Sequence, residues 1–307
     1  MPRDTMPEAA PRSGVGAALL AVAVFVWWGV FPAYFKLLVS VSPAEILAHR
    51  ILWSAVLMVA LLLATGRMPA LRRIMADRRT LGMLALAALL IAANWLTYVA
   101  CVTSGHVLAA SLGYFISPLA NVALGRIVLG ERLTRLQAAA CLLAALAVAG
   151  LAVAAGSELW RAVVLALTFG CYGLVRKMVR AEPVPGFAVE CLVLAPLAAG
   201  YLAWQTTTGA GPFDHPPGIV ALLLLSGLLT AGPLLGYATA ARQLRLSTLG
   251  LLNYIAPTIQ FVLGIVVWNE PFDLVRLAGF ATIWLALALY SVEMVRLLRR
   301  LQAPIRT

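Results

Sequence analysis

The sequence predicts an all-α polytopic membrane protein with ten transmembrane helices in two inverted five-helix repeats. Three observations predict this class. The 307-residue chain is 63% hydrophobic and only 11% charged, with a mean hydropathy of +0.95, which is far from a soluble domain. Apolar segments long enough to cross a bilayer, which takes about 20 residues, recur from end to end. A segment of the first half also recurs in the second half at a constant offset.

The repeat is clearest between residues 110–137 and 249–276. Proline, glycine and glutamate recur there in one register, and each constrains a helix in its own way. We interpret the repeat as an internal duplication, with halves at 14–155 and 156–298 and cytoplasmic tails at 1–13 and 299–307. Without a gap, Leu112, Ile116, Pro118, Leu124, Gly125, Val128 and Glu131 match Leu251, Ile255, Pro257, Leu263, Gly264, Val267 and Glu270, and Tyr98 matches Tyr237.

Ten membrane spans are expected from the apolar runs. A nine-span alternative would merge the third and fourth spans or the fourth and fifth, but each merged helix would be too long for the membrane. The first run continues to the charged Lys36 without a convincing cleavage site, so a retained span is favoured over a signal peptide. The spans are expected at 14–36, 44–65, 80–102, 106–129, 134–154, 158–178, 187–206, 218–241, 246–268 and 274–297.

The basic residues favour cytoplasmic termini. With both termini inside, most arginines fall in cytoplasmic loops, and only Lys36, Arg161 and Arg276 remain near outer span ends. Because each repeat has five spans, an odd number, the second half then begins on the opposite side of the membrane. The halves are therefore expected to be inverted about an axis in the membrane plane, an arrangement typical of secondary transporters.

Several partners and chemistries are disfavoured. The net charge of +11 sits in short loops without a basic, aromatic-rich face, so we expect anionic lipid rather than nucleic acid beside it. The four cysteines lie in apolar runs without C-x-x-C spacing, which disfavours metal and disulfide roles. No Walker loop, H-E-x-x-H or G-x-S-x-G sequence is present. We expect no cofactor and no enzymatic activity.

Ionisable residues inside a membrane are costly and are therefore site candidates. Glu45, His49 and Arg50 cluster at the outer end of the second span, with Glu45 and His49 on one helical face. They are candidates for ion coupling, and a structural ion-pair network is an equally acceptable interpretation. Glu190, near the inner end of the seventh span, is a pseudo-symmetric candidate, with pairing to Arg176 or Lys177 as the structural alternative.

Aromatic and amide residues deeper in the spans are candidates for a pocket that binds an amphipathic solute. Any one of them could instead be an interhelical hydrogen-bonding group. Pro118 and Pro257 are candidate helix breaks, whereas Glu131 and Glu270 are expected to be structural, at the start of the next helix. The substrate-binding candidates are Trp28, Asn94, Tyr98, Tyr114, Asn121, Tyr172, Tyr237, Asn253, Tyr254 and Gln260.

Three strings in the chain carry a resemblance to a known family. These are residues 32–54 (PAYFKLLVSVSPAEILAHRILWS), 94–133 (from NWLTYVACVTSGHVLAASLGYFISPL) and 245–264 (RLSTLGLLNYIAPTIQFVLG). Nearly the whole chain resembles the RarD proteins, which are EamA-type members of the drug/metabolite transporter superfamily. The resemblance implies ten helices in two inverted repeats, an inner-membrane location, and efflux or permease activity. RarD proteins are often labelled chloramphenicol-sensitive, but the resemblance fixes no substrate.

The leading hypothesis is therefore a secondary transporter of a small amphipathic solute such as a drug, amino acid or metabolite. One rival is an intramembrane enzyme acting on a lipid or isoprenoid phosphate, with Glu45, His49 and Arg50 holding the phosphate. A second rival is a regulatory or scaffold membrane protein. The inverted repeat disfavours both rivals, because neither needs two exchangeable faces.

Overall fold

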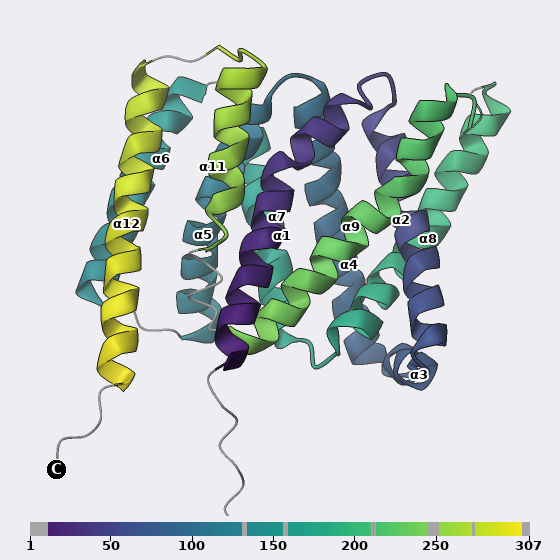
Figure 1. Ribbon diagram of the computed structural model, residues 1–307, viewed down its shortest axis with the longest axis horizontal. Helices are drawn as coiled ribbons and strands as arrows, with labels where there is room; N and C mark the ends of the chain where they lie inside the picture. Colours follow the sequence, from purple (N-terminus) through teal and green to yellow (C-terminus); the bar gives the residue numbers. More distant parts are fainter. Residues whose placement is uncertain are drawn as a thin grey trace, which may run out of the picture.

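The computed structural model describes residues 12–130, 134–155, 159–209, 211, 213–244, 252–271 and 274–302. The described residues form an all-helical bundle whose long helices run roughly side by side, with α12 near one end and α8 near the other (Figure 1). The helices are α1 (Arg12–Lys36), α2 (Pro43–Ala64), α3 (Met68–Ala76), α4 (Arg78–Thr103), α5 (Val107–Leu129), α6 (Arg135–Ala155), α7 (Leu159–Met178), α8 (Pro183–Thr207), α9 (Pro217–Gln243), α11 (Ile255–Val262) with the π-helical segment η2 (Leu263–Val267), and α12 (Leu274–Gln302).

Six helices in the described part of the chain are long and apolar enough to cross a membrane: α1, α2, α4, α7, α8 and α9. Shorter apolar stretches occur in α5, α6, α12, and α11 together with η2. The predicted class, an all-α polytopic membrane protein, is confirmed at this level. Part of the expected span 246–268 lies outside the described residues.

Helix α3 was not expected from the hydropathy pattern. It occupies the basic loop between the second and third expected spans, and it lies across the lower edge of the bundle in Figure 1. Only Leu71 of this helix is buried, against the core formed by α2, α4 and α8. A nine-residue amphipathic helix is too short and too polar to register as a span.

Local sequence explains where the helices begin and end. Ser42 caps α2 by accepting a hydrogen bond from the amide of Glu45, and Pro43 occupies the first helical position. Asp77 caps α4 through the amide of Arg79. Burial plays little part at this exposed cap, and its hydrogen bonds hold the pKa of Asp77 below the usual value. The turn between α4 and α5 passes through Gly105, whose φ of 79° favours glycine.

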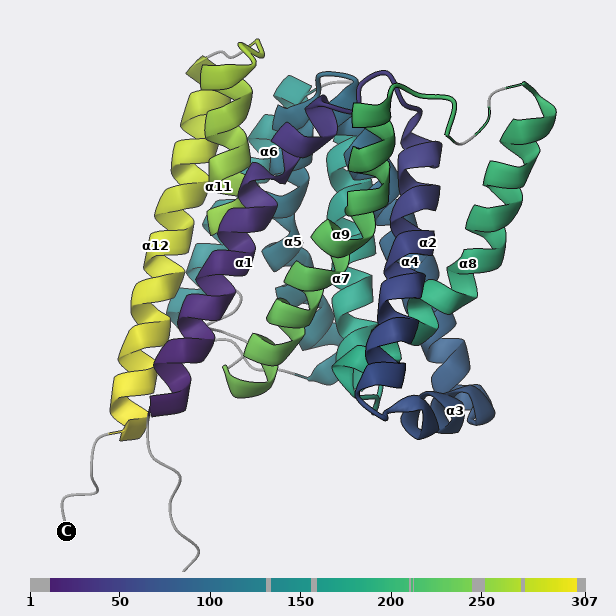
Figure 2. The same ribbon diagram turned by 45° about the vertical axis from the view of Figure 1, so that its right-hand side comes forward.

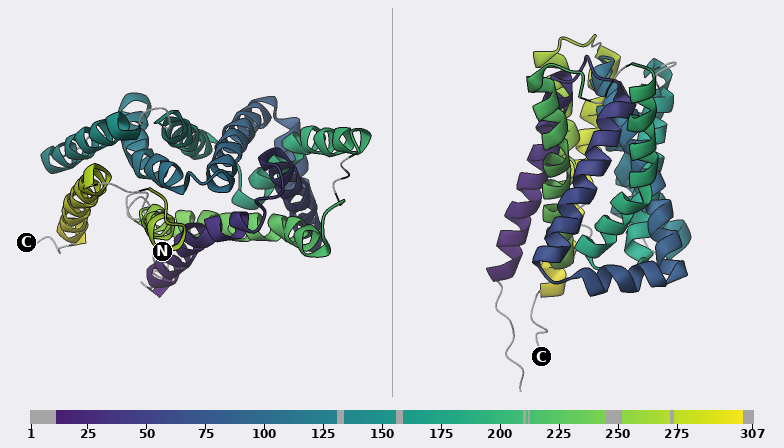
Figure 3. Two further views of the ribbon diagram at one scale, coloured as in Figure 1. Left: turned by 90° about the horizontal axis from the view of Figure 1, so that it is seen from above. Right: turned by 90° about the vertical axis from the view of Figure 1, so that its right-hand side faces the viewer.

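Helices from the two halves of the chain interleave. Helix α2 packs against α8 and α9, α4 packs against α7, and α1 packs against α9 and α11 (Figure 2). Helix α5 packs against α7, and α6 packs against α12 at one end of the elongated bundle (Figures 1 and 3). The core of the bundle is therefore built from helices of both halves.

The two predicted helix breaks fall in different places. Pro118 lies within α5. Pro257 is the third residue of α11, which begins directly after the turn at Asn253 and Tyr254. The carbonyl of Pro257 accepts a hydrogen bond from the Ser111 hydroxyl at 2.8 Å, which ties α11 to α5.

Candidate functional site

A cavity lies between the two halves, bounded by α1, α2, α4, α5, α7, α9, α11 and the turn before α11. Six of the predicted substrate-binding residues line it: Trp28, Asn94, Tyr98, Tyr114, Asn253 and Gln260. The lining also includes Phe31, Arg50, Ile91, Trp95, Phe169, Thr230, Leu234, Ala256 and Pro257. Apolar and aromatic walls with a few polar groups are the usual composition of a pocket for an organic molecule.

Three other predicted substrate-binding residues, Tyr172, Tyr237 and Tyr254, have their contacts elsewhere. Tyr237 packs against Phe25 and Trp28, behind the wall that Trp28 forms. Tyr254 stacks on Phe115 in the core between α5, α6 and α12. Tyr172 donates a hydrogen bond to Glu190. The side chain of Asn121 lies outside the described residues.

Asn94 is the polar centre of the cavity wall on α4. Its amide nitrogen donates to the carbonyl of Leu165 at 2.9 Å and to the hydroxyl of Thr168 at 3.0 Å, both on α7. Its amide oxygen accepts from the hydroxyl of Tyr114 on α5 at 3.1 Å. These three hydrogen bonds join α4 to α5 and α7. Asn94 therefore positions this wall of the cavity and holds Tyr114 in place.

Arg50 and Gln260 present polar atoms in the cavity wall. The Nε of Arg50 donates to the hydroxyl of Thr230 at 3.0 Å, and the guanidinium lies 4.6 Å from the ring centre of Trp95. The amide nitrogen of Gln260 donates to the backbone carbonyl of Trp28 at 3.0 Å. Arg50 is 3% exposed and Gln260 is 2% exposed, so both side chains are removed from bulk water.

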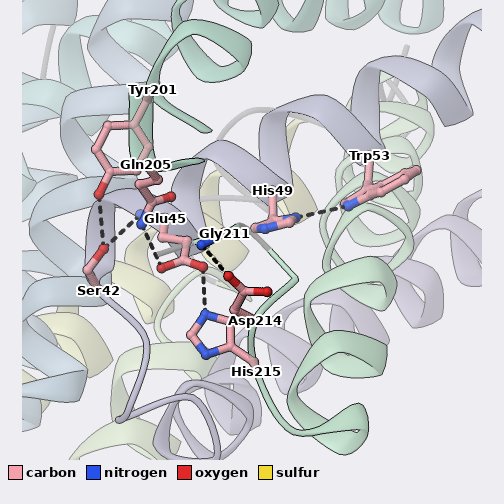
Figure 4. A network of polar contacts seen from close by, with 9 residues as sticks. All are labelled: Ser42, Glu45, His49, Trp53, Tyr201, Gln205, Gly211, Asp214 and His215. Carbon is pink, nitrogen blue, oxygen red and sulfur yellow. Dashed lines mark hydrogen bonds and ion pairs between the residues drawn. The ribbon is translucent and has the colours of Figure 1, made fainter. Parts of the chain in front are cut away.

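Arg50 and Glu45 are close in sequence, but their side chains lie in different sites. The carboxylate of Glu45 accepts a hydrogen bond from Gln205 at 3.0 Å and lies 2.7 Å from Nε2 of His215 (Figure 4). Arg50 instead faces the central cavity, because it lies more than one helical turn further along α2 and on another face. The predicted cluster of Glu45, His49 and Arg50 is therefore divided between two sites.

The polar network around Glu45 includes residues that the sequence did not connect to it. Gln205 lies in the last turn of α8, and His215 lies in the loop before α9. Nδ1 of His49 accepts a hydrogen bond from the indole of Trp53 (Figure 4). The ring of His49 also meets Phe213 edge to face. This network joins the start of α2 to the end of α8 and to the following loop.

Glu190 forms the counterpart at the other end of α8. It is 1% exposed, accepts a hydrogen bond from Arg176 at 3.0 Å, and accepts another from Tyr172 at 3.3 Å. The structural alternative that pairs Glu190 with Arg176 therefore describes its contacts. Glu45 and Glu190 are both buried carboxylates, and they lie at opposite ends of the packed pair α2 and α8.

The polar groups of the described residues can be compared with those that bind metals. Within the described residues, no group of three or more histidine, cysteine, aspartate or glutamate side chains could hold a metal ion. The four cysteines are free. The polar atoms that face the cavity belong to amide, hydroxyl and guanidinium groups, which suit an organic ligand.

Comparisons with known proteins give the class of this fold. Residues 14–153 match the EamA-like transporter family. A solved crystal structure with 19% sequence identity superposes with a TM-score of 0.64, covering 90% of this chain and 98% of the other. At that identity the likeness shows a shared fold. The helical bundle and the family match define an EamA-like membrane protein.

Similar proteins identify the family within this class of membrane proteins. The chain is 43% identical to an uncharacterized transporter, PA0485 of Pseudomonas aeruginosa, over 93% of this chain and 96% of that one. It is 41% identical to protein RarD of Escherichia coli over 94% and 97%. The chain belongs to the RarD-type family of the drug/metabolite transporter superfamily, as the three sequence strings predicted.

Proposed function

We propose that this protein is a secondary transporter that moves small amphipathic solutes through the central cavity by alternating access. The observation that carries the proposal is the cavity itself, which is walled by helices of both halves and contains buried polar atoms from α2, α4 and α11. A solute held there contacts both halves. Rocking of one half against the other would then expose the solute to one side of the membrane at a time.

The packing pattern supports two inverted five-helix repeats. If α1, α2, α4, α5 and α6 correspond to α7, α8, α9, α11 and α12, each of the larger contacts between these helices across the two halves has a partner or maps onto itself. The contact of α4 with α7 then corresponds to α9 with α1, and α5 with α7 corresponds to α11 with α1. The contact of α2 with α9 corresponds to α8 with α4, while α2 with α8 and α6 with α12 map onto themselves. An exchange of conformations between halves needs this correspondence.

The positions of the helix ends and of the basic residues support a protein with ten spans in the inner membrane. Both termini would then lie on the cytoplasmic side. Helix α1 begins and α12 ends at the same edge of the bundle, where α3 also lies (Figure 1). Helix α3 and its flanks carry Arg67, Arg72, Arg73, Arg78 and Arg79. An excess of arginine near span ends marks the cytoplasmic side.

Glu45 is our first candidate for a proton carrier, with His49 beside it and Glu190 as its counterpart at the inner end. Glu45 is 4% exposed and its carboxylate contacts one imidazole and one amide. A buried carboxylate whose contacts differ between the two conformations of a transporter can bind a proton in one and release it in the other. Proton movement is then coupled to solute movement.

Flux in sealed vesicles tests the proposed function. We expect the purified, reconstituted protein to move at least one solute from a panel of amino acids, aromatic acids and amphipathic metabolites in a saturable way. The alternative enzyme would turn over a lipid or isoprenoid phosphate in detergent without a sealed compartment. Turnover in detergent without saturable flux in vesicles would replace the transporter proposal with the enzyme.

A further inference from the structure

The guanidinium of Arg50 is a buried cation that forms no ion pair with a carboxylate among the described residues. Of its nitrogen atoms, Nε donates to Thr230, while Nη1 is buried and has no hydrogen-bond partner among the described residues. The ion pairs of the described residues join other groups, and Arg50 takes part in none of them. Within the part of the chain that the structure describes, the charge of Arg50 is unpaired and its Nη1 donor is unused.

The surroundings of Arg50 stabilise the cation only in part. Its guanidinium carbon lies 4.6 Å from the ring centre of Trp95, 5.2 Å from Phe35 and 5.5 Å from Phe31. Aromatic faces attract a cation, but they do not accept the in-plane hydrogen bonds of a guanidinium. A guanidinium presents a planar fork of donors that matches the two oxygen atoms of a carboxylate. These rings therefore leave Nη1 of Arg50 without an acceptor, and a carboxylate is one group that would supply it.

Two further buried polar atoms of the cavity lining have no hydrogen-bond partner among the described residues. They are Oε1 of Gln260 and the hydroxyl of Tyr98. The bond from Nε2 of Gln260 to the carbonyl of Trp28 requires the amide nitrogen at that position, so the amide oxygen is the free acceptor. An N–H or O–H group on a ligand would donate a hydrogen bond to this amide oxygen.

We propose that the cavity binds a small organic anion, with its carboxylate on Arg50, a donor group on Gln260, and an apolar or aromatic body among Trp28, Phe31 and Trp95. This inference rests on the proposed transport function and names its substrate class. Arg50 is then the specificity-determining residue that selects a carboxylate over an uncharged analogue. Thr230 is a positioning residue, because its hydroxyl holds Nε and orients the guanidinium.

Matched pairs of probes test the substrate class. We would measure equilibrium binding of 3-phenylpropanoate against 3-phenylpropanamide, and of hexanoate against hexanamide, to the purified full-length protein near pH 7. Each pair differs only in replacement of the carboxylate by an uncharged amide. We expect saturable binding of at least one carboxylate and at least about 30-fold weaker binding of its amide, as for loss of one partner of a buried charge pair. Equal affinities within both pairs would overturn the inference.

Variants locate the carboxylate. Arg50→Met should weaken binding of the carboxylate at least about 30-fold, and Arg50→Lys should recover only part of it, because lysine keeps the charge without the fork. Removal of the exposed Arg126 by Arg126→Met is the matched control and should leave affinity unchanged. If Arg50→Met does not fold, Gln260→Leu provides the test, since it should weaken binding of a carboxylate that also carries an O–H donor, such as 3-phenyllactate, more than binding of 3-phenylpropanoate. Unchanged affinities in the folded variants would overturn the inference.

Vesicle flux separates failure of this inference from failure of transport. Transport of an uncharged phenyl glucoside, with no binding of any carboxylate probe, would overturn the anion assignment and leave the transporter in place. Saturable, Arg50-dependent binding of a carboxylate, with no flux of any solute in sealed vesicles, would support the anion site and overturn the transport proposal.

Discussion

The carboxylate of Glu270 caps the helix that begins at Val107, in the other half of the chain. Its oxygen atoms accept hydrogen bonds from the backbone amides of Val107 at 2.7 Å and Leu108 at 2.8 Å. The sequence predicted a structural role for Glu270 at the start of the following helix; the helix that it caps is instead α5. The first amides of a helix have no partner within that helix, so this contact satisfies two of them.

Removal of this cap should destabilise the protein. We expect Glu270→Ala to lower the free energy of unfolding by about 1–2 kcal/mol, since two amides lose their acceptors. Glu270→Gln should cost less, because one amide oxygen remains. Equilibrium unfolding in mixed micelles measures the difference. Glu182→Ala, which removes an ion pair with Arg67 whose side chains are both more than 50% exposed, is the control and should cost less than about 1 kcal/mol.

Glu270 should also make the free energy of unfolding depend on pH. Burial raises the pKa of Glu270 above its usual value, and the two backbone hydrogen bonds oppose this shift. The folded state therefore binds the proton more tightly than the unfolded state does. Stability from this group should be fully present below the usual glutamate pKa and should be lost as the pH rises through the raised pKa. Wild-type protein should lose more stability over this window than Glu270→Gln, and an equal loss would contradict the assignment.

Gly186 is expected to be essential for the ion pair between Arg176 and Glu190. A Cβ at this position would lie 2.7 Å from Nη1 of Arg176, the atom that bonds Glu190. The arginine can move, but the carboxylate of Glu190 would then be left buried without its cation. We expect Gly186→Ala to lower the free energy of unfolding by about 1–3 kcal/mol.

Gly200 provides the matched control for this substitution. It lies on the same helix, and a Cβ there would meet no atom within 4 Å. Gly200→Ala should therefore be neutral or should stabilise the helix by up to about 1 kcal/mol. Equal effects of the two substitutions would show that the distance to Arg176 has no energetic consequence.

Helix positions were predictable because a bilayer imposes a minimum length of apolar sequence. The first two spans, expected at 14–36 and 44–65, match α1 and α2 closely. The cavity was predictable in part, since Asn94, Tyr98 and Gln260 stood out as polar or aromatic residues in apolar runs. Such residues are rare enough in a span to suggest a site.

Contacts between distant segments were not predictable from one sequence. Glu45 and Arg50 are near neighbours in sequence, but their partners His215 and Thr230 lie in the second half. The helical period shows only that two positions face different directions, and it does not show which helix each one meets. The same limit explains why Glu270 was assigned to the nearest helix in sequence.

The contact between α2 and α9 should not tolerate a larger residue. A Cβ on Gly227 would lie 2.5 Å from both the backbone carbonyl carbon and the Cβ of Trp53, and neither atom can move alone. Because Arg50 and Thr230 bond across the same interface, Gly227→Ala should both destabilise the bundle and weaken solute binding. Gly218→Ala, near the start of α9 with nothing within 4 Å of its added Cβ, should do neither. Unfolding and binding measured on both variants check this prediction.

Glu45 should be required for accumulation against a gradient if it carries the coupling proton. Glu45→Gln keeps the size of the side chain and a hydrogen-bond acceptor for Gln205, but it cannot ionise. We expect the folded variant to lose proton-driven accumulation in vesicles while it retains exchange of solute across the membrane. Undiminished accumulation would remove Glu45 from the coupling mechanism.

Alternating exposure of the cavity is the central claim, and two-sided cysteine labelling tests it most directly. Ala256 lines the cavity on α11 and is 6% exposed, whereas Ala240 is fully buried against α1 and serves as the control. In a variant that lacks the four native cysteines, Ala256→Cys should react with an impermeant thiol reagent from each side of the membrane. Ala240→Cys should react from neither side. Reaction of Ala256→Cys from one side only, with or without a bound solute, would contradict alternating access.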